Sequence, residues 1–285
     1  MAGSVLRIAV VGAGRMGQGL GGALAARGQS VTILGRRAQD VTPPFNLQAD
    51  AWGPALRAAD VVILATPDAA VPDLAAELAG LGVLEKRQVV LHLAGPLDKS
   101  VLAPLEPTGA ALGSFHPLQT VANPEGAAER LRGAYAGLEG DARAQEMGAQ
   151  LAKLLEMKSF IIPAGAKAKY HAAAVLVANY TIGLLGVAQR IAGEAGIPAD
   201  IAIRMYQPLM EGAMANLAAM GPLQALTGPI RRGDLATLRI HLAALSARDR
   251  ELYRIVGLAV LGVARAAGLT EERAQQVEAL LDGRS

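Results

Sequence analysis

Apolar residues in the first half of the chain alternate between short continuous runs and stretches with helical periodicity. Runs typical of buried parallel strands lie at residues 7–11, 30–34, 60–65, 88–93, 111–115, 135–138 and 159–162. Helical periodicity falls between several of them, over residues 15–27, 71–81 and 143–157. This alternation predicts βαβ units and a mostly parallel, doubly wound sheet.

The pattern changes after Pro163, beyond which no strand-like run occurs. Helical segments are predicted instead over residues 167–194, 199–219, 234–267 and 270–282. Glycine–proline pairs interrupt them, which is typical of helix ends. The sequence therefore predicts an α/β domain over residues 1–164 and an all-α helical domain over residues 165–285.

A glycine motif connects the first predicted strand to the first predicted helix. Gly12, Gly14 and Gly17 have the spacing G-x-G-x-x-G, in the strand-to-helix context that dinucleotide binding requires. Such glycines permit a tight turn, close approach to a pyrophosphate and close helix packing. The N–H groups at the helix start, around Arg15 and Met16, are then available to phosphate. The alternative is a plain glycine-rich turn, but the context favours a Rossmann domain.

The end of the second predicted strand bears on which dinucleotide binds. NAD sites usually carry an acidic residue about 20 residues past the glycines. Here the strand ends in Gly35, Arg36 and Arg37, and no acid occurs before Asp40. A guanidinium suits the 2′-phosphate of NADP(H), so NADP(H) is the predicted cofactor. A solvated basic turn is the alternative.

Loops that follow other strands add cofactor contacts. In open α/β sheets, ligands bind at the carboxyl ends of the strands. Ala65, Thr66 and Pro67 follow one such strand, and Ala94 follows the next. We expect all four along the cofactor, while Asp68 is interpreted as the cap of the next helix.

Candidate catalytic residues lie at the ligand end of the sheet and at the start of the helical domain. His116, in the segment Ser114–Thr120, can relay a proton near neutral pH or merely shape its loop. Lys169 and His171 open the first long helix of the second domain, where an interdomain cleft commonly binds ligand. Lys169 can polarise a carbonyl, and Asn179 can orient substrate. Solvation of Lys169, and interruption of an apolar seam by Asn179, are the alternatives.

A second polar turn, Thr227–Asp234, leads into a later helix. Asp234 is a plausible N-cap. Arg231 and Arg232 can bind an anionic substrate or remain solvated, and the role of His241 is left open.

Composition excludes several classes of site. The chain has no cysteine, so disulfides, thiolate metal sites and cysteine nucleophiles are excluded. No metal-ligand spacing such as H-E-x-x-H occurs, and no metal is predicted. A net charge of only +2 gives no reason to expect nucleic acid as a partner. We expect a cytoplasmic protein.

Residues 172–188 form a run of 17 residues without charge. It is rich in alanine and glycine and short for a membrane span, which needs about 20 strongly apolar residues. We interpret it as a buried helix and expect no membrane contact. Because one small helical domain can hardly bury it alone, the sequence predicts a homodimer built on that domain.

These motifs together resemble a bacterial family of Rossmann-like proteins assigned as NADP-dependent oxidoreductases. The resemblance rests on residues 12–17, 66–67, 114–120, 169–179 and 227–234. It implies a C-terminal helical domain of unknown function. The first half also resembles deazaflavin-dependent NADP oxidoreductases and pyrroline-5-carboxylate reductase.

Two further comparisons concern the mechanism. Residues 115–118 are similar to the His-Pro motif of prephenate dehydrogenases, which implies a catalytic role for His116, although the rest of that pattern is missing. The β-hydroxyacid dehydrogenases place an asparagine four residues after their catalytic lysine, where this chain has Ala173.

The sequence thus predicts an NADP(H)-dependent oxidoreductase. The expected substrate is a small, anionic metabolite in the interdomain cleft that gains or loses hydride at a C=O/CH–OH or C=N/CH–NH bond. The alternative is a non-catalytic NADP(H)-binding regulatory or sensing protein. A catalytic cleft should bring Lys169 and one of His116 and His171 together beside the nicotinamide.

Overall fold

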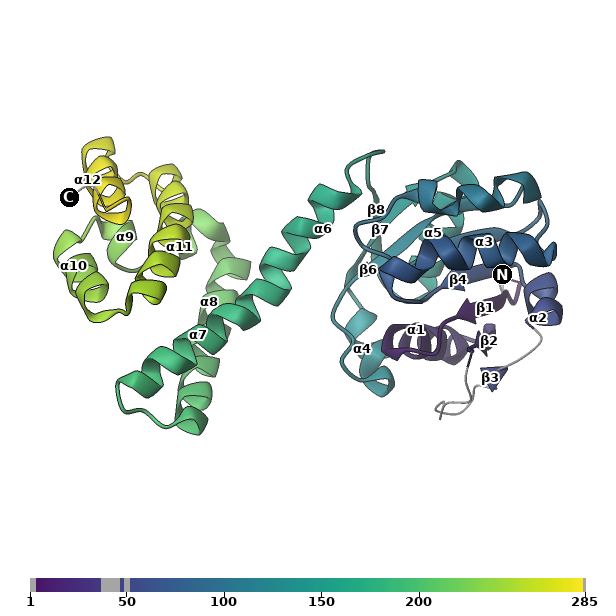
Figure 1. Cartoon of the computed structure of the whole chain (residues 1–285), viewed down its shortest axis with the longest axis horizontal. Helices are drawn as coiled ribbons and strands as arrows, with labels where there is room; N and C mark the ends of the chain where they lie inside the picture. The colour runs from purple at the N-terminus through teal and green to yellow at the C-terminus, as the bar shows by residue number, and fades with distance from the viewer. Residues whose placement is uncertain (1–3, 37–46, 49–51, 284–285) are drawn as a thin grey trace. The chain divides into compact units, whose positions relative to one another are not determined.

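The chain divides into two compact units, which are described separately here (Figure 1). The structure is a computed structural model that describes residues 4–36, 47–48 and 52–283. The sheet unit comprises Met1–Ala178 and the helical unit comprises Asn179–Ser285. The predicted boundary, after residue 164, precedes helix α6 (Lys167–Val175), which the structure groups with the sheet.

An eight-stranded sheet in the order β3-β2-β1-β4-β5-β6-β7-β8 forms the centre of the sheet unit. All neighbouring strands are parallel except β6 and β7. The strands are β1 (Arg7–Val11), β2 (Ser30–Leu34), β3 (Leu47–Gln48), β4 (Val61–Leu64), β5 (Val89–His92), β6 (Ala111–Leu118), β7 (Tyr135–Gly140) and β8 (Lys158–Ile161). The chain reverses its winding direction between β1 and β4, where α/β sheets of this kind bind ligand.

Helices cover both faces of this sheet. The helical segments are α1 (Arg15–Ala26), α2 (Gly53–Ala58), η1 (Asp68–Ala70), α3 (Val71–Leu81), η2 (Lys99–Thr108), η3 (Pro124–Gly126), α4 (Ala127–Leu131) and α5 (Ala142–Leu154). On β4, Ile63 packs into the core beneath α1 and α5, and Leu64 packs into the core beneath α2, α3 and η2. Burial on both faces explains why these strands are continuously apolar.

The predicted fold class is confirmed, an α/β Rossmann-type domain followed by an all-α domain. Each predicted strand is present within a few residues. Strand β3 and the helices α2 and η2 were not predicted. η2 contains Pro104 and Pro107, which break the amphipathic periodicity that would have indicated a helix.

The helical unit has a small core of its own. Its helices are α7 (Thr181–Glu194), α8 (Ala199–Ala225), α9 (Pro229–Arg232), α10 (Leu235–Ala244), α11 (Ala247–Ala266) and α12 (Glu271–Leu281). Leu238, Leu261 and Val277 are fully buried among helices α9 to α12. The predicted single helix over residues 234–267 is wrong: it breaks before Ser246, whose side chain accepts a hydrogen bond from Asp249 N and caps α11.

The interpretation of residues 172–188 as a buried helix is also wrong for the single chain. Residues 167–194 form one long apolar helix, which consists of α6, a π-helical turn at Leu176–Tyr180 and α7. An 18-residue window within it has a mean hydropathy of 1.6 and no buried residue. Length and composition alone would allow this helix to cross a membrane. The side chains of this window are therefore not buried within either unit.

Candidate functional site

The glycine turn has the geometry of a pyrophosphate cradle. Gly12 has a φ of +122°, and a Cβ there would lie 2.6 Å from the Ala65 carbonyl oxygen. A Cβ on Gly17 would lie 2.0 Å from the Gly12 oxygen, so α1 packs directly on the turn. Above Gly14, in contrast, there is open space, and no side chain caps the first turn of α1. The N–H groups near Arg15 and Met16 are thus accessible, as phosphate binding requires.

The loop after β4 borders the same turn. Ala65 and Thr66 are partly buried next to Gly12, and Pro67 leads into η1. The Thr66 hydroxyl is buried and has no hydrogen-bond partner among the described residues. A buried unpaired hydroxyl costs about 1–3 kcal/mol unless a ligand satisfies it. These observations fit the predicted dinucleotide, with Thr66 as a hydrogen-bonding residue.

The two predicted arginines follow β2, and the structure describes one of them, Arg36. Arg36 is exposed and forms an ion pair with Glu77 of α3, while the Gly35 carbonyl accepts a 3.3 Å bond from Trp52 Nε1. Arg37 lies outside the described residues. Arg36 is therefore at the ribose end of the predicted site, with its charge already shared with a carboxylate.

A row of polar side chains crosses the sheet where an apolar core would be expected. Ser114 of β6 pairs with His92 of β5 and with Glu139 of β7, so the three side chains lie on one face of neighbouring strands. All three are buried, at 0%, 1% and 6% exposure for His92, Ser114 and Glu139. Glu139 accepts a 2.8 Å bond from the Lys99 N–H. Buried polar rows of this kind are costly and usually functional.

Lys167 reaches this row from the start of α6. Its side chain is 1% exposed, and its Nζ donates to Ala94 O at 2.9 Å and to Ser114 Oγ at 3.0 Å. An ammonium has three donors, so one remains for another acceptor. Burial lowers the pKa of Lys167 to about 8, although nearby Glu139 opposes the shift. Lys167 therefore releases and regains a proton close to neutral pH.

Three aromatic side chains lie next to this lysine. His116 Nδ1 and the Tyr170 hydroxyl are 2.9 Å apart, and the His116 and His171 rings meet edge to face at 5.4 Å. Gly95 makes room for His171, because a Cβ there would lie 2.0 Å from the His171 Nδ1. That Nδ1 is buried and has no partner in the part of the chain described. The ring thus holds an unsatisfied polar atom next to the loop after β5.

Burial sets the protonation of the neighbouring rings. It lowers the pKa of His116 to about 3 and that of His92 to about 4, and the Lys167 charge lowers both further. Burial raises the pKa of Tyr170 to about 12. At neutral pH both imidazoles and the phenol are uncharged. Among Lys167, His92, His116 and Tyr170, Lys167 therefore has the pKa nearest to 7.

Helical geometry explains which predicted residues join the cluster. Residues three and four apart share a helix face, so Lys167, Tyr170 and His171 all face the sheet. Lys169 is displaced by about 200° around α6 from Lys167, and its side chain is exposed. Asn179 is exposed and belongs to the helical unit. Of the four predicted catalytic residues, the structure brings together His116 and His171.

Lys167 was not predicted as a site residue, although its spacing from other polar residues in the sequence indicates a shared helix face. The spacing Lys167, Tyr170, His171 is the i, i+3, i+4 pattern of one face. Ser114, Glu139 and Tyr170 were also missed. Each is a polar residue in or beside a predicted strand or helix. The pairing of β6 with β7 brings Ser114 and Glu139 together, and the contact with His116 adds Tyr170.

The polar turn of the helical unit has a structural explanation in part. Asp234 caps α10 as predicted, accepting a bond from Thr237 N at 3.1 Å. His241 Nδ1 lies 2.9 Å from the Tyr253 hydroxyl, which accounts for its position within the unit. Arg231 and Arg232 line a surface cavity, described below.

The fold and the glycine cradle define a dinucleotide-binding protein of the Rossmann class. Residues 7–95 match the family model described as NADP oxidoreductase, coenzyme F420-dependent. Residues 134–260 match a domain of unknown function, DUF2520. These matches confirm the predicted resemblance, the enzyme class, an NADP-dependent oxidoreductase, and the cofactor, NADP(H).

Solved structures support the fold over nearly the whole chain. A protein from Thermotoga maritima is 24% identical, with a TM-score of 0.69 over 91% of this chain and 98% of its own. A candidate NADP oxidoreductase from Bacteroides fragilis is 21% identical, with a TM-score of 0.69 over 92% and 98%. Pyrroline carboxylate reductase from Plasmodium falciparum, solved with NADP bound, is 11% identical, with a TM-score of 0.63 over 96% and 98%. A comparison with proteins of curated function gave no match.

Proposed function

We propose that this oxidoreductase transfers hydride between NADP(H) and a small anionic metabolite, at a C=O/CH–OH or C=N/CH–NH bond, with Lys167 as the proton donor and acceptor. One observation carries the proposal: a buried lysine with a pKa near 8 donates hydrogen bonds to Ser114 and to the Ala94 carbonyl at the ligand end of the sheet. The pyrroline carboxylate reductase and reductive aminase structures similar to this chain bind NADP or NADPH, which is consistent with a C=N or C=O substrate.

Each residue of the cluster has a distinct proposed role. NADP(H), when bound, supplies or accepts the hydride, and Gly12, Gly14 and Thr66 would hold it. Lys167 would protonate the substrate oxygen or nitrogen during reduction, and remove that proton during oxidation. Ser114 fixes the ammonium by accepting one of its hydrogen bonds. Tyr170 donates a hydrogen bond to the substrate or to the neutral His116 ring.

A pair of lysine variants tests this assignment. A panel of keto acids, imines and hydroxy acids is screened for NADPH oxidation or NADP⁺ reduction by the parent protein. With the substrate so identified, Lys167→Met should retain NADPH binding and lose turnover. Lys169→Met is the matched control, because Lys169 is exposed two residues away. Full activity in Lys167→Met would disprove the role of Lys167. Binding of NADPH without turnover of any compound would instead favour the regulatory alternative.

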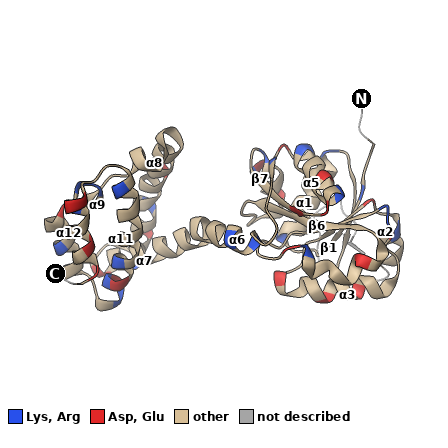
Figure 2. Ribbon diagram, turned by 90° about the horizontal axis from the view of Figure 1, so that it is seen from above, with Lys and Arg blue, Asp and Glu red and all other residues tan. Residues whose placement is uncertain are grey.

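We propose further that the active protein is a homodimer built on the helical unit. The support is the apolar surface of α7 and α8, where Ile182 and Leu209 are each 67% exposed. Figure 2 shows α7 largely in tan, the colour of uncharged side chains. A second copy would cover this surface by two-fold symmetry. The cytoplasm, without membrane or nucleic acid as partner, remains the proposed setting.

A further inference from the structure

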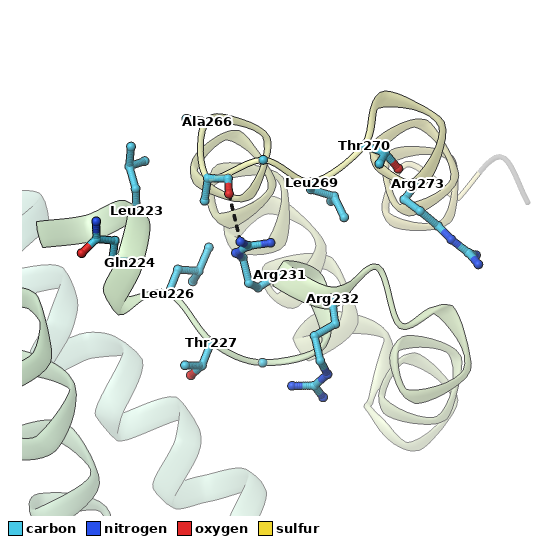
Figure 3. Close-up of a pocket in the computed structure, with 13 residues that line it drawn as sticks. Leu223, Gln224, Leu226, Thr227, Arg231, Arg232, Ala266, Leu269, Thr270 and Arg273 are labelled. Atoms are coloured by element: carbon cyan, nitrogen blue, oxygen red, sulfur yellow. Dashed lines mark hydrogen bonds between the residues drawn. The ribbon is translucent and has the colours of Figure 1, made fainter. Parts of the chain in front are cut away.

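A cavity in the helical unit, separate from the proposed hydride-transfer residues, is lined by an unusual set of side chains (Figure 3). It has a volume of about 1000 Å³ and lies where the end of α8, the turn before α9, the end of α11 and the start of α12 meet. Three of its lining residues are arginines: Arg231, Arg232 and Arg273. None of its lining residues is an aspartate or glutamate. The cavity therefore concentrates positive charge without a matching carboxylate in its wall.

Backbone geometry brings two of these arginines to adjoining positions. Gly233 has a φ of +65°, and a Cβ there would lie 3.2 Å from the Cβ of Arg273. The turn that carries Arg232 is therefore pressed against α12. Asp234 fixes the far side of the turn by capping α10 through Thr237. Arg232 and Arg273 thus leave the backbone on either side of this contact, and their side chains extend in different directions (Figure 3).

The existing contacts of the arginines leave most of their donors available. Arg231 Nη2 donates to the Ala267 carbonyl at the end of α11, at 2.9 Å, which orients its guanidinium (Figure 3). Arg273 Nη1 donates to an uncharged amide, Gln276 Oε1, at 3.0 Å. Arg232 lies 4.0 Å from Asp234, at the limit of an ion pair. A guanidinium carries five N–H donors, so each can still bind an anion.

The other residues of the cavity wall indicate which kind of ligand the cavity can bind. Thr270 precedes α12 and makes no side-chain capping bond, so its hydroxyl can donate to a ligand, although Glu271 and Glu272 carry negative charge in the first turn of that helix. Leu223, Leu226 and Leu269 provide an apolar side. Pockets for small ligands are typically about 300–1,000 Å³ and combine a few polar groups with apolar walls. A monoanion would leave two of the three arginine charges unpaired, whereas a dianion would leave one unpaired.

We propose that this cavity binds a small organic dianion, a phosphate monoester or a dicarboxylate, whose short apolar body lies against the leucines. Arg231 forms the fixed contact, and the side chains of Arg232 and Arg273 close on the ligand from the rim. Paired hydrogen bonds between guanidinium and phosphate or carboxylate supply the specificity. The proposal is independent of the proposed hydride-transfer chemistry, because all of its residues belong to the helical unit.

Calorimetric titration of the full chain tests the proposal. The protein is first saturated with NADP⁺, so that the phosphate cradle of the sheet unit is filled. Butyl phosphate, glutarate and butyrate are then compared. We expect one or both dianions to bind saturably and more tightly than butyrate, with affinity falling as salt increases. Which dianion binds more tightly distinguishes a phosphate site from a dicarboxylate site. The proposal is overturned if neither dianion binds at millimolar concentration, or if butyrate binds equally well.

Substitutions of the lining arginines test whether the dianion binds in this cavity. Arg232→Gln and Arg273→Gln alter exposed side chains and should each weaken dianion binding about tenfold or more, while Arg231→Gln should weaken it most. Arg239→Gln, an exposed arginine on α10 outside the cavity, is the matched control and should leave it unchanged. Melting curves of all four variants identify any loss of folding in Arg231→Gln. Unchanged affinity in both rim variants, or an equal loss in Arg239→Gln, would show that the dianion binds elsewhere.

Discussion

Helix α3 of the sheet unit and helix α7 of the helical unit are both rich in apolar residues, but only α3 buries them within the chain. Val71, Leu74 and Leu78 of α3 pack under the sheet and are at most 2% exposed. In α7 only Ala192 is buried, while Ile182 is 67% exposed. The same apolar periodicity therefore marks an internal core in one unit and an external surface in the other.

The difference follows from what each unit offers as a neighbour. A parallel sheet presents two apolar faces, and helices from the same chain cover both. Helix α7 packs against α8 only in part, and the small core of the helical unit is built by α9 to α12. The sheet unit thus buries its apolar helices internally, whereas the helical unit leaves apolar side chains of α7 exposed. If this comparison is right, variants in the sheet unit should alter chemistry, and variants on α7 should alter assembly.

The largest effect is expected in the sheet unit, at Lys167. Removal of a general acid or base typically costs about a hundred- to ten-thousandfold in rate, and Lys167→Met should fall in this range. Because its pKa is about 8, reduction by the parent protein should slow as the pH rises through 8 and the ammonium is lost. Turnover across pH 6–10 measures both effects. A reduction rate that stays level across pH 8 would contradict protonation by Lys167.

The second effect concerns the cofactor. Arg36→Ala should weaken NADPH binding about ten- to a hundredfold, since a charge-assisted hydrogen bond contributes about 1.5–3 kcal/mol. NADH binding should change little, because NADH lacks the 2′-phosphate. Fluorescence titration with both cofactors measures the two affinities in parallel. Equal losses for NADPH and NADH would show that Arg36 does not read the 2′-phosphate.

Glu77 provides a sharper form of the same test. It shares the charge of Arg36 in the structure, so Glu77→Gln should release the guanidinium and strengthen NADPH binding a few-fold. Arg87→Gln is the control. Arg87 is an exposed arginine just before the start of β5, at the strand end away from the predicted cofactor site, so the substitution should leave the affinities for NADPH and NADH unchanged. Weaker NADPH binding in Glu77→Gln would mean that the ion pair positions Arg36 instead of competing for it.

The strands and the cofactor cradle could be predicted because local signals determine them. Buried parallel strands are continuously apolar, and the glycine spacing identifies the turn without any knowledge of tertiary contacts. The break at Ser246 was missed because residues 234–267 keep a helical composition on both sides of it. Only the cap that Ser246 makes to Asp249 distinguishes two helices from one.

The polar cluster around Lys167 could be predicted only in part, because it depends on the pairing of distant strands. His116 and His171 stand out in a chain with four histidines. Glu139 does not, since its importance comes from its register opposite Ser114. Lys169 was predicted as a site residue and Lys167 was not, although the two lie only two residues apart on α6, where Lys169 is exposed and Lys167 is buried. Lys167 shares the helix face toward the sheet with Tyr170 and His171, and this spacing distinguishes it from Lys169.

The third effect concerns assembly of the helical unit. Ile182→Glu places a charge on the exposed apolar surface of α7, so it should convert a dimer to monomers or shift the equilibrium strongly toward them. Ile240→Glu is the matched control, because Ile240 is 68% exposed on α10. Light scattering at micromolar concentration gives the mass. A parent protein with the mass of one chain, unchanged on dilution or with NADPH present, would refute the dimer.

The smallest effect, on stability, separates the two lysines once more. The folded-state pKa of Lys167 is about 8, below its ordinary value of 10.5. The folded protein thus binds fewer protons than the unfolded chain between these pH values. The parent should gain stability over this window, by up to about 1.4 kcal/mol in unfolding free energy for each pH unit. Lys167→Met should lack that gain and Lys169→Met should keep it. Urea unfolding of the three proteins at pH 7.5, 8.5 and 9.5 makes the comparison. Parallel pH profiles for all three would mean that Lys167 keeps an ordinary pKa, and with it that a buried, proton-exchanging lysine is not what distinguishes the sheet unit from the helical one.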